Sequence, residues 1–214
     1  QENRQATINH VLKTASGFGG CNASLIVSSS ANDQIVNDGR EFSIAKKVIV
    51  EKNSVKINDS IFLNSDEAEF SKFIKSAYKK LGIKYPKFYK MDNLCKLAFI
   101  ASEALLKDEE LNERFKPEEI ALVFSNGSSS LDTDADYQAT IDNRDNYFPS
   151  PAVFVYTLAN IMLGEIAIRN KFKGENAVFI SEAYDNEFVS EYVRQLYKKG
   201  NTKACITGRV EYSW

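Results

Sequence analysis

Three cysteines and one histidine are the side chains in this sequence best suited to covalent chemistry. They are Cys21, Cys95, Cys205 and His10. A single histidine excludes a histidine-rich metal site. A catalytic pair of a nucleophile and a histidine could use only His10. The cysteines are odd in number and widely spaced, which favours free thiols over a disulfide framework or a zinc site. We expect Cys95 to lie on a helix and to pack in or near the protein core, and His10 to lie at the surface or in a hairpin.

A glycine-rich stretch near the start of the sequence, TASGFGGCNASLIVSS, is the second candidate site. A phosphate-binding P-loop needs a lysine after its last glycine, and none follows Gly20. A dinucleotide-binding loop precedes a helix, whereas NASLIVSS is typical of a strand. A hairpin turn, with NHVLKTAS as the partner strand, is the simplest interpretation from the residues alone.

The acidic series Asp132, Asp134 and Asp136 in LDTDAD is the third candidate, because it spaces carboxylates as part of a calcium loop does. It lacks the glycine at the sixth position and the glutamate at the twelfth position of such a loop. We therefore expect a solvated loop here and no metal.

The composition restricts the class of protein. The 214 residues include 27 Lys and Arg against 29 Asp and Glu, a net charge of −2. This balance gives no electrostatic reason to expect binding to nucleic acid or to an anionic membrane. No secretory signal is visible, and no uninterrupted apolar stretch is long enough to span a bilayer. We expect a cytoplasmic protein without a cofactor.

The elements that must position these residues follow from hydrophobic periodicity. Short β-type runs occupy residues 43–63, and helices are predicted over 66–82 and 90–108. A long loop covers 126–150. From residue 119 onward the predicted order is strand, helix, strand, helix, strand, with elements at 120–124, 151–174, 176–181, 186–200 and 204–207. This alternation predicts a three-layer α/β fold, with a mixed, mostly parallel sheet between helices.

Two stretches resemble the β-ketoacyl-acyl carrier protein synthases. LKTASGFGGCNASLIVS is similar to the C-terminal family motif, commonly NSFGFGGTNASLV. SPAVFVYTLANIMLGEIAIRNKFKGENAVFIS resembles a segment of the family that leads into the nucleophile strand. Its matching residues are Ser150, Pro151, Asn160, Gly164, Ala167, Ile168, Gly174 and Asn176. The resemblance implies a thiolase-like fold, about one half of a synthase. It divides the chain into a C-terminal-like part, 1–42, and an N-terminal-half-like α/β part, 43–214.

The sequence departs from the family at the nucleophile. The synthase strand ends in a cysteine at a helix N-terminus, where the helix dipole favours the thiolate. Here the same register is FISEAYDNEF, so Tyr184 occupies the nucleophile position. A phenol is a poor nucleophile toward a thioester at neutral pH, and Asp185 and Glu187 disfavour an anion further. The two histidines of the family have no counterpart, since His10 aligns with neither.

The resemblance therefore implies a non-catalytic partner of an active, full-length β-ketoacyl synthase, as chain-length-factor subunits are. Acyl carrier protein is an implied partner, and a homo- or heterodimer is the implied assembly. Phe18 matches the family's gate beside the acyl pocket, which Gly17, Gly19, Gly20 and Asn22 would shape. The implied interface comprises the long helix near 153–170 and the loop near 126–150, with Phe154, Tyr156 and Asn160.

Two rival classes of function stay open. One is an active acyltransferase or condensing enzyme that uses a nucleophile foreign to the family, Cys21 or Tyr184. The other is a structural homodimer without a role in acyl transfer.

The order of the two motifs is unusual, because the C-terminal-like motif precedes the N-terminal-half-like segment. Either a synthase tail is fused to this chain or the family order is rearranged. The order of the motifs alone does not distinguish these two origins.

Overall fold

The computed structural model describes residues 10–16, 22–28, 42–51 and 53–212. Contacts divide the chain into two units, Gln1–Gly39 and Arg40–Trp214. In the first unit, β1 (His10–Ser16) and β2 (Asn22–Ser28) form an antiparallel hairpin that pairs Ser16 with Asn22. This confirms the predicted strand pair around the glycine-rich stretch. The turn itself lies outside the described residues.

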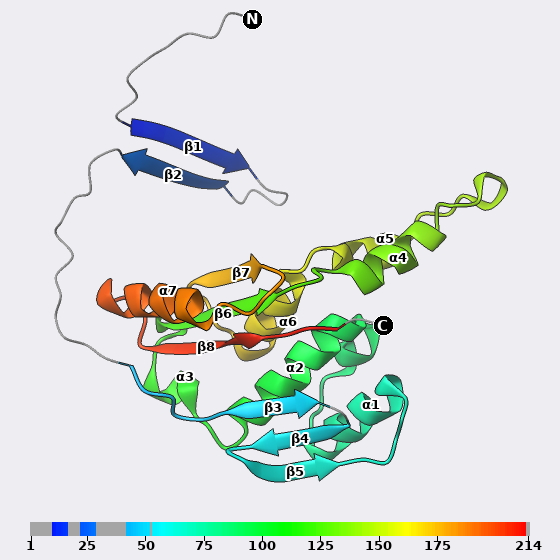
Figure 1. Cartoon of the computed structure of the whole chain (residues 1–214), viewed down its shortest axis with the longest axis horizontal. Coiled ribbons are helices and arrows are strands. Elements are labelled where there is room, and N and C mark those ends of the chain that lie inside the picture. Colours follow the sequence, from blue (N-terminus) through cyan, green and yellow to red (C-terminus); the bar gives the residue numbers. More distant parts are fainter. Residues whose placement is uncertain (1–9, 17–21, 29–41, 52, 213–214) are drawn as a thin grey trace, which may run out of the picture. The chain divides into compact units, whose positions relative to one another are not determined.

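The second unit begins with a three-stranded antiparallel sheet, drawn in blue to cyan in Figure 1. Its strands are β3 (Val48–Glu51), β4 (Ser54–Ile57) and β5 (Ser60–Asn64). Asn58 and Asp59 join β4 to β5 with φ values of 47° and 65°. Both values suit a two-residue hairpin turn that matches the twist of the strands, and short polar side chains tolerate them best.

A three-stranded parallel sheet in the order β7-β6-β8 forms the centre of the second unit. β6 (Ile120–Asn126) is buried along its whole length between β7 (Asn176–Ile180) and β8 (Ala204–Arg209). Ile120, Leu122 and Phe124 contact the larger core, while Ala121 and Val123 face the opposite side. Alternate residues of the central strand thus pack against the helical layers on opposite faces of the sheet, as the predicted three-layer fold requires. The antiparallel strands form separate sheets, so the predicted single mixed sheet is wrong in this detail.

Helices cover both faces of the parallel sheet (Figure 1). α2 (Asn93–Leu106) and α6 (Ile161–Asn170) pack on one face, and α7 (Asn186–Lys198) packs on the other. The remaining α-helices are α1 (Phe70–Lys80), α3 (Leu111–Arg114), α4 (Leu131–Ala139) and α5 (Pro151–Phe154). The 3-10 turns are η2 (Pro86–Lys90), η3 (Pro117–Glu119), η4 (Arg144–Asn146) and η5 (Val155–Thr157).

The predicted long helix over 151–174 is wrong. α5 and η5 form one piece and α6 another, with an angle of 98° between them. The hydroxyl of Thr157 donates to the carbonyl of Phe154 at 2.8 Å, and Leu158 adopts an extended conformation. Such a hydrogen bond from a side chain to the backbone competes with helix continuation. No single helix among the described residues is long and apolar enough to cross a membrane, although this bent pair passes the same test of length and composition.

The predicted solvated loop at LDTDAD is also wrong, because these residues begin α4. Asp132 and Asp134 lie in its first turn, where the helix dipole favours negative charge. The buried hydroxyl of Thr133 donates to Asp92 at 2.7 Å, and Asp132 accepts from Asn93 at 3.0 Å. These bonds attach α4 to the N-terminus of α2. No group of His, Cys, Asp and Glu within the described ranges is placed to hold a metal ion.

Candidate functional site

Tyr184 lies in the turn that connects β7 to α7, at the carboxyl end of the parallel sheet. The Asp185 side chain caps α7 by accepting from the backbone N–H of Phe188 at 2.9 Å. Tyr184 thus directly precedes a helix N-terminus, as the family register predicts for the nucleophile position. Its side chain is 41% exposed. The strand, turn and helix are present, with a phenol at the position that the resemblance assigns to the thiol.

Backbone contacts hold this turn against the neighbouring strands. The N–H of Ser181 donates to the carbonyl of Asn126 at 2.9 Å, which extends the pairing of β6 with β7. The hydroxyl of Ser181 donates to the carbonyl of Ala183 at 2.8 Å. From β8, the guanidinium of Arg209 donates to the carbonyls of Ser181 and Glu182, at 3.4 and 3.1 Å. The Tyr184 turn is therefore fixed by all three strands.

Glu211 is the ionic centre of this edge of the sheet. Its carboxylate accepts from the N–H groups of Gly127 and Ser128, at 2.6 and 3.0 Å, and from the Ser128 hydroxyl. Arg209 lies 2.9 Å from the same carboxylate. Burial alone would raise the pKa of Glu211, but these hydrogen bonds and the Arg209 charge together lower the pKa below its usual value.

This geometry is suited to holding a turn in place. The backbone donors of Gly127 and Ser128 already bind Glu211, so they do not offer a free oxyanion hole. A carboxylate whose pKa is lowered is a weak general base for the Ser128 hydroxyl beside it. A Cβ at Gly127 would lie 2.5 Å from Arg209 Nη2 and 2.9 Å from Glu211 Oε2, so a larger residue there would displace the ends of these two side chains and disturb their ion pair.

Sequence reasoning missed the residues at this edge of the sheet that hold the turn: Asn126, through its carbonyl, and Ser128, Arg209 and Glu211, through their side chains. A usable signal was present, because each follows or ends a strand that was predicted to be buried and parallel. Parallel strands bring their carboxyl ends to one edge of the sheet, where α/β proteins place their sites.

Replacing Glu211 by Gln should loosen the Tyr184 turn. The amide keeps the shape of the side chain but lacks the charge that pairs with Arg209 and strengthens the bonds from Gly127 and Ser128. We expect a loss of about 1–3 kcal/mol in the free energy of unfolding at pH 7. Because the folded pKa of Glu211 is lowered, its contribution is present above the unfolded pKa and is lost as the pH falls. Urea unfolding at pH 7 and pH 4 should therefore show a smaller difference between the variant and the wild type at pH 4.

The two thiols that the structure describes are unsuited to nucleophilic catalysis. Burial, followed by the negative charge of Asp92, raises the pKa of Cys95 far above its usual range. Burial raises the pKa of Cys205 to about 12. Cys95 is 2% exposed, in the core as predicted. Both thiols stay protonated at neutral pH, whereas a catalytic thiol needs its thiolate form.

These thiols should make the fold sensitive to alkali. Because the pKa of each thiol is raised in the folded state, the stabilisation that the protonated thiols give is complete below the pKa of an unfolded thiol, about 8.5. This stabilisation is lost as the pH rises above that value. We expect the free energy of unfolding to fall between about pH 8.5 and 9.5, by up to roughly 1.4 kcal/mol per thiol. A Cys95→Ala, Cys205→Ala variant, measured by urea unfolding over the same range, should show a flatter profile. If the free energy of unfolding fell equally steeply with pH in the variant, the loss of stability could not be assigned to these two thiols.

The other predicted site residues fall into separate groups. The loop residues Gly17, Phe18, Gly19, Gly20 and Cys21 lie outside the described residues. Asn22 and His10 lie in the hairpin, and His10 pairs with Ser28. Of the proposed interface residues, Phe154 and Asn160 are exposed. Tyr156 is partly buried and donates to Glu165 at 3.2 Å.

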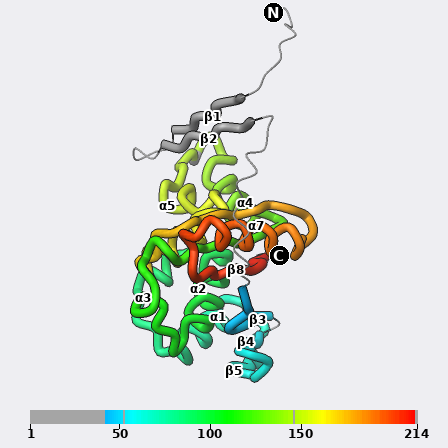
Figure 2. Tube along the Cα trace, turned by 90° about the vertical axis from the view of Figure 1, so that its left-hand side faces the viewer, coloured from blue at the N-terminus to red at the C-terminus, as the bar shows by residue number. Residues whose placement is uncertain are grey.

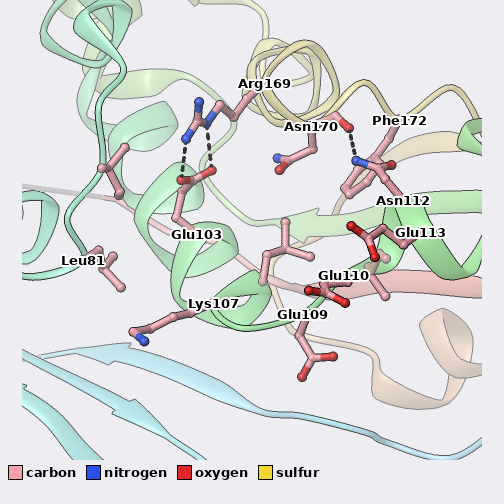
Figure 3. Close-up of a pocket in the computed structure, with 13 residues that line it drawn as sticks. Leu81, Glu103, Lys107, Glu109, Glu110, Asn112, Glu113, Arg169, Asn170 and Phe172 are labelled. Atoms are coloured by element: carbon pink, nitrogen blue, oxygen red, sulfur yellow. Dashed lines mark hydrogen bonds and ion pairs between the residues drawn. The ribbon is translucent and has the colours of Figure 1, made fainter.

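Two surface cavities lie away from Tyr184. The cavity in Figure 3 has a volume of about 340 Å³ and lies between α2, α3 and the end of α6. Polar groups in its wall pair with each other: Arg169 forms two hydrogen bonds with Glu103, and Asn112 donates to the carbonyl of Asn170. The other cavity, about 400 Å³, lies at the amino end of β7, with Glu175 and Asn176 in its wall. Neither contains the residues that the family register assigns to chemistry.

Comparison with known proteins gives a likeness among solved structures. No family model and no curated protein sequence matches this chain. Among solved structures, it is similar to one described as "The ishigamide ketosynthase/chain length factor", with 25% identity and a TM-score of 0.51. The match covers 58% of this chain and 36% of that one, so the chain spans well under half of the structure it resembles. Together with the parallel sheet between helices, this likeness supports a ketosynthase/chain-length-factor-like relation and a fold consistent with the thiolase-like α/β class.

Proposed function

We propose that this chain is a non-catalytic, chain-length-factor-like partner of a full-length β-ketoacyl synthase in polyketide-type or fatty-acid biosynthesis. The observation that carries the proposal is that Tyr184, a phenol, lies between β7 and the N-terminus of α7, at the position that the resemblance assigns to the nucleophile. The proposal is supported by the buried thiol of Cys95, the partly buried thiol of Cys205 and the occupied donors of Gly127 and Ser128. It is also supported by the likeness to a ketosynthase/chain length factor.

In this proposal the chain contributes shape and the partner contributes chemistry. The partner synthase supplies the cysteine and histidines, and acyl carrier protein delivers the substrates in the cytoplasm. The family motif implies that Phe18 and the backbone of Gly17–Gly20, which lie outside the described residues, would line part of an acyl pocket. The fixed turn at Tyr184 fills the position at which a thiol would otherwise bind the acyl chain.

A condensation assay tests the proposal. The purified chain alone, supplied with acyl- and malonyl-acyl carrier protein, should release no carbon dioxide and form no β-ketoacyl product. Adding the partner synthase should give product whose formation or length depends on the chain, and Tyr184→Phe should leave this effect unchanged. Turnover by the chain alone that disappears in Cys21→Ser or in Tyr184→Phe would contradict the non-catalytic role.

A further inference from the structure

Residues 70–91, here called the basic segment, carry a dense concentration of positive charge. They contain seven lysines and no aspartate, glutamate or arginine, a charge of +7 in a chain whose net charge is −2. The segment comprises α1, the turn after it and η2. The net charge of the whole chain conceals this uneven distribution, so an expectation drawn from net charge alone misses the basic segment.

The lysines of the basic segment are exposed, and most of them have no counter-ion. Lys72 pairs with Glu69 at 3.3 Å, and Lys87 pairs with Glu165 at 2.8 Å. The other five form no ion pair within the part of the chain that the structure describes. These are Lys75, Lys79, Lys80, Lys84 and Lys90. Their charges are therefore available to a partner.

α1 directs its lysines away from the protein core. Its buried side chains are Phe73, Ile74, Ala77 and Tyr78. Lys72, Lys75 and Lys79 lie at helical spacing on the opposite face, and all three are exposed. α1 packs against α2 and is the farther of the two from the parallel sheet in both views (Figures 1 and 2). The lysine face of α1 is thus open to solvent.

Aromatic contacts hold the rest of the basic segment against the end of α1. The N–H of Tyr85 donates to the hydroxyl of Tyr78 at 2.7 Å. The rings of Tyr78 and Phe88 stack with centroids 4.4 Å apart. These contacts bring the turn that carries Lys84, and the 3-10 turn that carries Lys90, against α1. The charges are therefore gathered by the fold as well as by the sequence.

The positive charge of α1 acts on the neighbouring helix. Lys96 lies in α2 and is half-buried. Burial lowers the pKa of Lys96, and the charge of Lys75 lowers this pKa further, although Asp92 opposes the shift. Like charges disfavour each other's charged forms in this way. An anion bound at the lysine face would relieve this repulsion.

The residue types of the basic segment restrict the class of partner. Protein interfaces are depleted in lysine and depend on clustered apolar or arginine anchors. Tyr89, 54% exposed, is the one strongly exposed large apolar side chain of residues 70–91. Bidentate recognition of single phosphates uses arginine, which the segment lacks. Clusters of lysine on an amphipathic helix are typical of attraction to anionic lipid, and tyrosine is enriched at membrane–water interfaces.

We infer that the basic segment binds the surface of an anionic lipid bilayer, with its lysines at the level of the lipid phosphates. The apolar face of α1 packs in the core, so the helix lies on the surface and does not insert. The attraction is the sum of several single charges and falls off within a Debye length, so salt should reverse it. This inference goes beyond the proposed function and does not depend on it.

Cosedimentation of the full chain with lipid vesicles tests the inference. Vesicles of phosphatidylcholine with about 30 mol% phosphatidylglycerol have a negative surface, and vesicles of phosphatidylcholine alone do not. In about 50 mM NaCl the chain should sediment with the anionic vesicles only, and about 500 mM NaCl should release it. A chain that stays in the supernatant with anionic vesicles at the lower salt concentration would overturn the inference.

Three triple variants assign the binding to the basic segment. Lys75→Gln, Lys79→Gln, Lys84→Gln should weaken vesicle binding at least tenfold, because it removes three unpaired charges. Arginine at the same three positions keeps the charge and should bind as the wild type does. The matched control, Lys47→Gln, Lys116→Gln, Lys199→Gln, removes the same charge from exposed lysines elsewhere and should weaken binding less than about threefold. Unchanged thermal unfolding shows that each variant is folded.

Two further outcomes would overturn the inference. Vesicle binding that falls equally in the glutamine variant and in the matched control would mean that net charge, and not the basic segment, is responsible. Binding to acyl carrier protein or to a DNA duplex, lost in the glutamine variant and without any binding to anionic vesicles, would assign the lysine face to that partner. Neither assay involves the synthase, so both outcomes leave the proposed function intact.

Discussion

Gly174→Ala is expected to destabilise this chain by about 3 kcal/mol, which lowers the melting temperature by about 6–12 °C. Gly174 lies between α6 and β7, directly against the residues that begin β6. A Cβ there would lie 2.8 Å from the carbonyl carbon of Ile120, nearer still to its oxygen, and 2.9 Å from the carbonyl oxygen of Glu118. All three atoms belong to backbone, so they cannot move aside as the end of a side chain can.

The contact at Gly174 matters because it lies where parallel pairing begins. The N–H of Lys173 donates to the carbonyl of Pro117 at 2.9 Å, and the N–H of Leu122 donates to the carbonyl of Glu175 at 2.8 Å. A methyl group between these bonds must separate β6 from the turn before β7. The effect should therefore reach the central strand of the sheet and is not confined to a surface loop.

Gly164→Ala is the matched control for this substitution. Gly164 lies inside α6, and a Cβ there would meet nothing within 4 Å. Alanine is preferred to glycine in a helix by roughly 0.5–1 kcal/mol, so this variant should be slightly more stable than the wild type. Thermal and urea unfolding of both variants checks the pair. Equal stability of Gly174→Ala and wild type would contradict the close backbone approach.

Much of the secondary structure could be predicted because it depends on local pattern. α1, α2 and α7 carry apolar side chains at helical spacing, and all three lie within their predicted ranges. β6, β7 and β8 are apolar runs between polar turns. The break before α6 could not be predicted, because residues on both sides of it are apolar and neither proline nor glycine marks it. α4 was missed since only Thr133 of its nine residues is buried, too few for a periodic pattern.

The start of the helix that follows Tyr184 was predicted, but the contacts that hold the turn were not. The family register placed Tyr184 at the start of a helix, and that turn exists. The bonds that fix it join residues far apart in sequence, since Gly127 and Glu211 are 84 positions apart. Only the parallel pairing of β6 with β8 brings them together. Such contacts depend on topology, which single-sequence patterns do not specify.

Lys87→Met is the second substitution expected to have a large effect, because it leaves a buried carboxylate without a counter-ion. Glu165 is 4% exposed in α6, and Lys87 Nζ lies 2.8 Å from its Oε2. Its other partner is the hydroxyl of Tyr156, at 3.2 Å. Burial, followed by the negative charge of Glu165, raises the pKa of Tyr156 well above its usual value. This ion pair therefore joins η2, η5 and α6 at the bend that separates the two apolar segments.

Removing one member of a buried ion pair costs more than removing both. Lys87→Met should lower the free energy of unfolding by about 2–4 kcal/mol at pH 7. Lys87→Met combined with Glu165→Gln removes the charge but keeps an acceptor for Tyr156, and should recover at least half of the stability. Urea unfolding at pH 7 decides the matter. A double variant less stable than Lys87→Met would mean that the ion pair itself, and not the unpaired charge, dominates the stability of this part of the fold.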